Sequence, residues 1–190
     1  IEEILEGGIW PMEAEISKLY KANGYNKPHK FIALLAALEL LKSDGFFSGI
    51  VNFDENFKNH FSMLFEKYAR PNDRNRPYTP FFHLKCLSFW KLVPQKGKEN
   101  QLENKGSIGG PCELSDLVSH AELSKQFVEH LKINDNYKRL KDLLLSILDK
   151  IRSEKMNNSP TIERIDMSST SELVSNNVFV GYLNSLQRVG

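Results

Sequence analysis

The sequence is poor in cysteine, because only Cys86 and Cys112 occur in 190 residues. Two cysteines without a CxxC spacing make neither a disulfide framework nor a paired-cysteine zinc finger, so we expect two free thiols. Long apolar runs are also missing: the longest, residues 31–38, is less than half of the roughly 20 residues that cross a bilayer. Since a basic, signal-like start is absent too, we predict a cytoplasmic protein without a membrane partner.

Catalytic motifs are equally scarce. The chain contains neither a phosphate-cradling P-loop nor a GxGxxG fingerprint. An HNH metal finger needs closely spaced histidines, whereas those of this chain are scattered: His29, His60, His83, His120 and His130. A carboxylate nuclease motif of the ExK kind can be drawn from Asp73, Glu103 and Lys105, but both acids fall in predicted loops, which hold a metal site poorly. A Cys–His nucleophile pair has no local support. We therefore predict a binding module that is not an enzyme and needs no metal or cofactor.

The composition is typical of a globular protein, with 41% apolar and 26% charged residues. A chain of this length can hold one domain with a sizeable core, followed by a tail. Beyond residue 153 the sequence becomes polar, with Asn- and Ser-rich stretches at 157–160 and 168–171. We predict a domain over residues 1–153 and, over residues 154–190, a linker that leads into the start of a further domain.

Apolar periodicity predicts a mainly α fold: a compact helical domain with a short β-hairpin and a long basic loop. The segment 31–41 is apolar on nearly all sides and should be the central buried helix. Further helices are expected at 11–24, at 54–68 with Asp54 as cap, as one turn at 81–85, around 123–131, and at 136–152 with Asp135 as cap. Strands are expected at 50–53 and 89–93, and a long loop or loose hairpin at 95–111.

Charge is unevenly distributed, although the net charge is only +1. Between Arg70 and Lys98 there are seven lysines and arginines and one acid, Asp73, whereas the first twenty residues hold five acids and one lysine. A segregated basic segment is what contact with a phosphate backbone requires. Arg70, Arg74 and Arg76 can form paired hydrogen bonds with phosphates or guanine edges. The alternative is a solvated lysine-rich loop.

Two stretches combine the features of a recognition site. Residues 76–93 hold two prolines, a histidine and several rings, which suit neither a core strand nor a surface loop and predict a rigid, partly buried corner. The second stretch opens the central helix, where Pro28 is expected near the first helical position. His29 and Lys30 follow, where free backbone N–H groups and the helix dipole favour an anion. The alternative is that His29 only caps the helix and Lys30 extends to solvent.

Three segments together resemble a known family. They are 27–30 (KPHK), 76–84 (RPYTPFFHL) and 89–94 (FWKLVP). In this order, over about residues 27–152, the chain resembles the sulfur-binding domain at the N-terminus of phosphorothioate-dependent restriction endonucleases, which usually carry an HNH nuclease domain downstream. The resemblance implies a mostly helical domain that binds double-stranded DNA in which sulfur replaces a non-bridging phosphate oxygen. It also implies a nuclease domain as the partner in the full-length protein.

The resemblance assigns roles to individual residues. His29 and Lys30 correspond to the basic pair that flanks the modified phosphate, and the corner around Pro80 corresponds to the sulfur pocket. The residues expected to bind DNA or sulfur are His29, Lys30, Tyr78, Thr79, Pro80 and His83. Those expected to contact the DNA backbone or the bases are Arg70, Arg74, Arg76, Lys105 and Ser107. In the family an aromatic residue usually precedes the pocket proline; here Thr79 does, so either Tyr78 or the Thr79 methyl forms that wall.

Two other functions are compatible with the sequence. One is a DNA-binding domain that serves a nuclease without depending on sulfur. The other is a helical protein-interaction module whose basic loop is incidental. A steep salt dependence of DNA binding would separate the first from the second.

Overall fold

The structure is a computed structural model that describes residues 11–22, 27–45 and 48–157. The acidic residues 1–10, the predicted helix stop at 23–24 and most of the predicted linker lie outside these ranges. The domain boundary after residue 153 therefore stays a prediction. None of the helices in the described ranges has both the length and the apolar content that a bilayer crossing needs.

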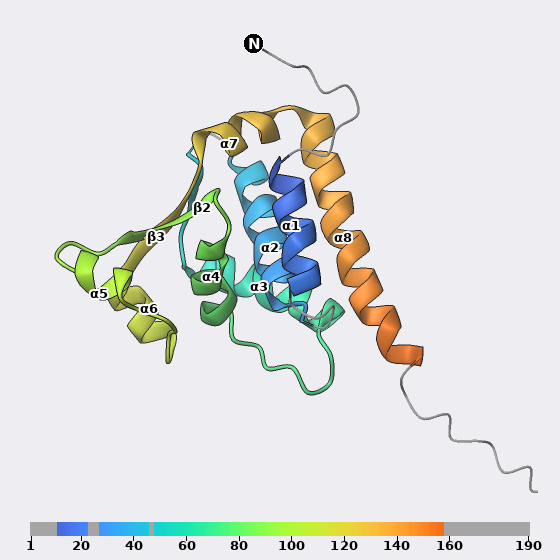
Figure 1. Ribbon diagram of the computed structural model, residues 1–190, viewed down its shortest axis with the longest axis horizontal. Helices are drawn as coiled ribbons and strands as arrows, with labels where there is room; N and C mark the ends of the chain where they lie inside the picture. The colour runs from blue at the N-terminus through green and yellow to red at the C-terminus, as the bar shows by residue number, and fades with distance from the viewer. Residues whose placement is uncertain (1–10, 23–26, 46–47, 158–190) are drawn as a thin grey trace, which may run out of the picture. The chain divides into compact units, whose positions relative to one another are not determined.

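Helices make up most of the described residues, together with one small sheet (Figure 1). The helices are α1 (Pro11–Ala22), α2 (His29–Ser43), α3 (Glu55–Tyr68), α4 (Tyr78–His83), α5 (Glu99–Glu103), α6 (Pro111–Leu117), α7 (Lys125–Lys132) and α8 (Asn134–Asn157), with a 3-10 turn, η1, at Leu84–Cys86. The strands are β1 (Ile50–Val51), β2 (Trp90–Pro94) and β3 (Val118–Leu123). The prediction of a mainly α fold is confirmed.

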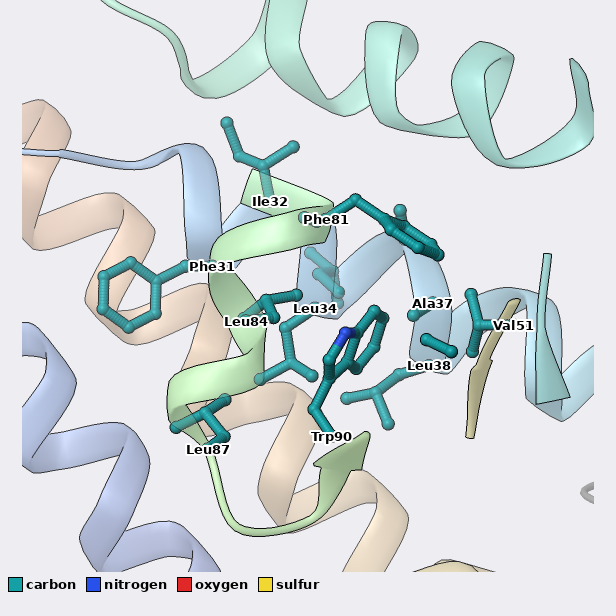
Figure 2. Close-up of a cluster of buried hydrophobic side chains, with 14 of the residues drawn as sticks. Phe31, Ile32, Leu34, Ala37, Leu38, Val51, Phe81, Leu84, Leu87 and Trp90 are labelled. Carbon is teal, nitrogen blue, oxygen red and sulfur yellow. The ribbon is translucent and has the colours of Figure 1, made fainter. Parts of the chain in front are cut away.

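Helix α2 is the centre of the core, as its sequence predicts. Residues 31–38 and Leu41 are all buried, because apolar side chains occur on every side of this helix. Helices α3, α4 and α8 pack around it. Figure 2 shows Phe81 of α4 and Trp90 of β2 among the apolar side chains of α2. The core therefore fixes α4 directly against the central helix.

The start of α2 lies one residue later than predicted. His29 is the first helical residue and Pro28 is the N-cap, whose carbonyl accepts the Ile32 N–H at 2.9 Å. A proline fits this position because no intrahelical bond requires its missing N–H. His29 and Lys30 are thus the first two helical residues, where backbone N–H groups lack intrahelical partners.

Helices α3 and α8 follow the predicted apolar stripes. Asp54 caps α3, since its carboxylate accepts the Phe57 N–H at 2.9 Å. Asp135 does not cap α8 as predicted but lies in its first turn, because the Ile133 carbonyl already accepts the Tyr137 N–H at 3.1 Å. The predicted face of α8 is buried, namely Tyr137, Leu140, Leu144, Ile147, Leu148 and Ile151.

The sheet contains one strand that the sequence pattern does not predict. Its order is β1-β3-β2, and both pairs are antiparallel. Strand β3 occupies residues 118–122, for which the sequence pattern predicts no element, and Leu123, which was expected to begin a helix. Helix α7 begins only after Ser124, whose hydroxyl accepts the Phe127 N–H at 3.3 Å. Strand β1 has two residues where four were predicted.

The predicted loop at 95–111 is partly helical. It contains α5, and α6 begins at its end, so β2 and β3 form a hairpin whose connection carries two short helices (Figure 1). Leu102 and Ile108 are buried and anchor this connection. Residues 104–110 keep an irregular conformation between α5 and α6.

Candidate functional site

A hollow of about 460 Å³, here called the basic hollow, lies at the start of α2. Its walls come from three segments that are distant in sequence: the α2 N-terminus, the loop before α4, and α4 itself. The lining residues are Lys27, His29, Lys30, Arg70, Asp73, Arg74, Arg76, Thr79, Pro80 and His83. The structure thus brings together eight of the eleven residues expected at the site. The other three, Tyr78, Lys105 and Ser107, do not line the hollow.

Helix α4 forms the aromatic-proline corner and begins three residues earlier than predicted. Pro77 is its N-cap, and the Pro77 carbonyl accepts the Phe81 N–H at 3.2 Å. Pro80 is tolerated as the third residue because N–H groups in the first turn of a helix have no intrahelical partner. This helix contributes Thr79, Pro80 and His83 to the lining of the basic hollow and buries Phe81 in the core.

The wall beside Pro80 comes from Thr79. Thr79 lines the hollow, whereas Tyr78 is partly buried and packs against the hydrophobic core. Pro80 is largely buried where it lines the hollow, and its ring is both apolar and rigid. The ring of His83, one turn further on, lies edge-on to that of Phe82, with 5.3 Å between the centroids. One side of the hollow is therefore rigid and largely apolar.

His29 is held from two directions. Its ring centroid lies 5.5 Å from that of Phe65, and the backbone of Arg74 lies close enough to favour the protonated imidazole. Burial lowers the pKa of His29, and Asp73 and the Arg74 carbonyl offset part of that shift. An imidazole whose pKa lies below its usual value is mostly neutral at pH 7. His29 therefore brings hydrogen-bonding capacity to the hollow rather than a fixed charge.

Lys30 and His83 lie close enough to influence each other. Burial lowers the pKa of His83, and the positive charges of Lys30 and Lys85 lower it further. The ammonium Nζ of Lys30 donates to Cys86 Sγ at 3.7 Å, which holds this lysine beside η1. At neutral pH the charge of the hollow consequently comes from lysines and arginines, not from its histidines.

The loop before α4 supplies three arginines and one acid to the hollow. Asp73 accepts hydrogen bonds from the Arg70 backbone N–H at 2.9 Å and from Arg70 Nε at 3.3 Å, so it closes a turn and neutralises that arginine. Four other lining cations form no ion pair with any residue in the described ranges: Lys27, Lys30, Arg74 and Arg76. These four are available to an anion.

Lys105 and Ser107 lie in the irregular segment between α5 and α6. Lys105 forms an ion pair with Glu113 of α6, and its backbone carbonyl accepts a hydrogen bond from Lys85 Nζ at 2.7 Å. Ser107 is exposed. Because Lys85 belongs to η1, which follows α4 directly, it links this segment to the element that lines the basic hollow.

Two lining residues, Lys27 and Asp73, were not among those expected at the site. Lys27 directly precedes the capping proline of α2, and this position beside the helix start could have identified it as a lining residue. Asp73 was considered only for a nuclease motif, but it follows Arg70 by three residues, a spacing at which aspartate closes turns onto the backbone.

Glu103, the other acid of that motif, lies at the end of α5 and outside the hollow. Over the described ranges, no three His, Cys, Asp or Glu side chains are grouped so that they could hold a metal ion.

Comparison with known proteins gives the family of the chain. A search of the curated proteins found no match. The family model described as "ScoMcrA-like, DNA sulfur-binding domain" matches residues 13–148. This match covers more than two thirds of the chain and includes all ten residues that line the basic hollow. The chain therefore belongs to the ScoMcrA-like DNA sulfur-binding domain family and is a DNA-binding domain.

Proposed function

We propose that this domain binds double-stranded DNA whose backbone carries a phosphorothioate, and that the basic hollow receives the modified phosphate. One observation carries the proposal: the hollow combines a rigid apolar wall at Thr79 and Pro80 with a cationic rim. Membership of a sulfur-binding family supports the same ligand. The functional residues are those of the hollow, with the segment 104–110 next to the DNA.

The apolar wall is the part that distinguishes sulfur from oxygen. Sulfur is larger and more polarisable than a phosphate oxygen and is more weakly hydrated. Against Pro80 a sulfur atom loses little hydration and gains dispersion contacts, whereas an oxygen loses its water without gaining a donor. The wall thus favours the modified phosphate by disfavouring the ordinary one.

The cationic rim supplies affinity without reading the modification. Lys30, Arg74 and Arg76 attract a phosphate backbone whether or not it carries sulfur, because both forms are anionic. The neutral His29, whose ring packs against that of Phe65, adds a hydrogen-bonding group at the α2 N-terminus. Affinity and selectivity therefore depend on different side chains.

In the cell, the proposed role is that of a targeting module. A domain that recognises sulfur in the DNA backbone directs an attached activity to modified DNA. We propose that the attached activity is a nuclease, so that the full-length protein is a modification-dependent restriction endonuclease in the cytoplasm. The domain itself would bind DNA without cleaving it.

Two substitutions in the hollow are expected to have different effects. Lys30→Ala should weaken binding to modified and unmodified duplexes alike, by about tenfold, because it removes one charge-assisted contact. Pro80→Ala should instead lower the ratio of the two affinities by up to about tenfold, because it removes apolar atoms from the wall at about 0.8 kcal/mol per methylene. Fluorescence anisotropy with matched duplexes, at one salt concentration, measures both effects.

Matched controls exist for each substitution. Lys125→Ala removes one exposed lysine from α7, outside the hollow, and Pro71→Ala replaces an exposed proline of the loop before α4 that does not line it. Lys125→Ala should leave both affinities unchanged, and Pro71→Ala should leave their ratio unchanged. The role assignment is refuted if Lys30→Ala abolishes sulfur discrimination while Pro80→Ala weakens both duplexes equally.

A further inference from the structure

The carboxylate of Glu113 is bound by the segment that precedes its own helix. One carboxylate oxygen forms an ion pair with Lys105 Nζ, and the other accepts the Gly109 backbone N–H at 2.6 Å. These two donors lie four residues apart and converge on one anionic group. The ion pair is only partly buried, with 36% of each side chain exposed, so solvent and ligands reach it.

Gly109 is suited to the close approach of an anion. A Cβ atom at this position would lie 3.2 Å from the Glu113 carboxylate, a contact tighter than most side chains accept. The absence of a side chain therefore leaves the Gly109 N–H open to an anionic oxygen. The same two donors hold the pKa of Glu113 below its usual value. An ionised carboxylate thus occupies a small site built from one lysine and one backbone N–H.

This site continues the cationic surface of the basic hollow. Lys85 Nζ donates to the Lys105 carbonyl at 2.7 Å and lies 4.0 Å from the ring centroid of Phe82. The charges of Lys85 and Lys30 both act on His83, which lines the hollow. A path of cations therefore runs from the hollow to Lys105. A DNA backbone seated in the hollow can extend along this path to the site that Glu113 fills.

We propose that Lys105 Nζ and the Gly109 N–H form a second phosphate site, and that Glu113 occupies it until DNA displaces the carboxylate. The inference rests on the proposed function, since the displacing ligand is a phosphodiester of the bound duplex. A phosphodiester presents two anionic oxygens, as the carboxylate does, so it can accept from the same two donors. Glu113 then acts as an internal competitor that lowers the affinity for DNA.

This role differs from that of a residue that only shapes the segment. If Glu113 merely positioned residues 105–110, its removal would loosen them and weaken DNA binding. As a competitor, its removal strengthens binding, because Lys105 is freed and one negative charge leaves the interface. The gain applies equally to both duplexes, since the second site receives an unmodified phosphate.

The test is Glu113→Gln, measured with matched duplexes with and without one sulfur. The expected result is an affinity about fivefold higher for both duplexes, the upper range for releasing an exposed ion pair, with their ratio unchanged. Lys105→Ala in the Glu113→Gln background should remove most of this gain. Glu113→Ala provides a second variant, which also empties the site and should bind more tightly than the wild type.

The control is Glu129→Gln, which removes the same charge from an exposed pair with Lys132 on α7, at 2.8 Å. It should leave both affinities unchanged. Unchanged or weaker binding by Glu113→Gln and Glu113→Ala, with thermal unfolding like that of the wild type, overturns the inference. A wild-type protein that binds both duplexes equally contradicts the proposed function, whereas tighter binding by the two Glu113 variants would still support the second phosphate site.

Discussion

Raising the salt concentration from 50 to 200 mM is expected to weaken the binding of this domain to duplex DNA about 150-fold. Four cations of the basic hollow form no ion pair with a described residue: Lys27, Lys30, Arg74 and Arg76. If each neutralises one phosphate, the logarithm of the affinity falls with that of the salt concentration with a slope of about −3.6. Arg70 is not counted, because Asp73 already neutralises it.

A salt titration followed by fluorescence anisotropy measures this slope. Arg74→Ala and Arg76→Ala should each reduce its magnitude by about one, since each removes one phosphate contact. Lys125→Ala serves as the control and should leave the slope unchanged. A slope near zero would contradict the assignment of the hollow as a phosphate-binding surface and would favour a protein-interaction module instead.

The second large effect concerns stability: Phe81→Ala is expected to lower the free energy of unfolding by about 3–5 kcal/mol. Phe81 is fully buried, and its ring lies edge-on to three others, at 5.2 Å from Phe53, 5.1 Å from Phe57 and 5.4 Å from Trp90 between centroids. Alanine leaves a cavity between α4, α3 and β2 that these rings cannot easily fill. Urea denaturation followed by circular dichroism measures the loss.

The same substitution also tests whether the core supports the site. Phe81 directly follows Pro80, so a loosened α4 no longer fixes the apolar wall, and sulfur discrimination should fall in the fraction that remains folded. Phe81→Leu keeps most of the buried volume and should cost less than half as much free energy. A loss below about 1 kcal/mol for Phe81→Ala would show that the core does not depend on this ring.

The elements that could be predicted from the sequence are those with local signals. Helix α2 is apolar throughout, α3 carries both a regular stripe and the Asp54 cap, and α8 repeats apolar residues over four turns. Such patterns depend on residues three or four apart, so they are visible without the fold. The exact start of α8 could not be predicted, because the Ile133 carbonyl accepts the first hydrogen bonds of the helix and isoleucine has no side-chain group that caps.

Strand β3 could not be predicted because its stability comes from pairing. It lies between β1 and β2, whose residues are 24 or more positions away in the sequence. Its own alternation is incomplete, since the partly buried His120 precedes the buried Ala121. Tertiary pairing therefore decides its conformation more than its intrinsic propensity does.

Most residues of the site could be predicted, but their arrangement in space could not. His29 and Pro80 are about fifty residues apart, so no local pattern states that they line one hollow; that expectation rested on the family resemblance. The choice of Thr79 over Tyr78 follows from the start of α4 at Tyr78, which the sequence alone placed three residues later. The ion pair between Lys105 and Glu113 depends on an irregular segment and has no sequence signature.

The central claim is that the apolar wall of the basic hollow recognises sulfur in the DNA backbone. The most direct measurement compares the affinities of the wild-type domain for two duplexes of identical sequence, one of which carries a single phosphorothioate, at the same salt concentration. Our account predicts clearly tighter binding to the modified duplex, with a difference that Pro80→Ala reduces. Equal affinity for the two duplexes would contradict it.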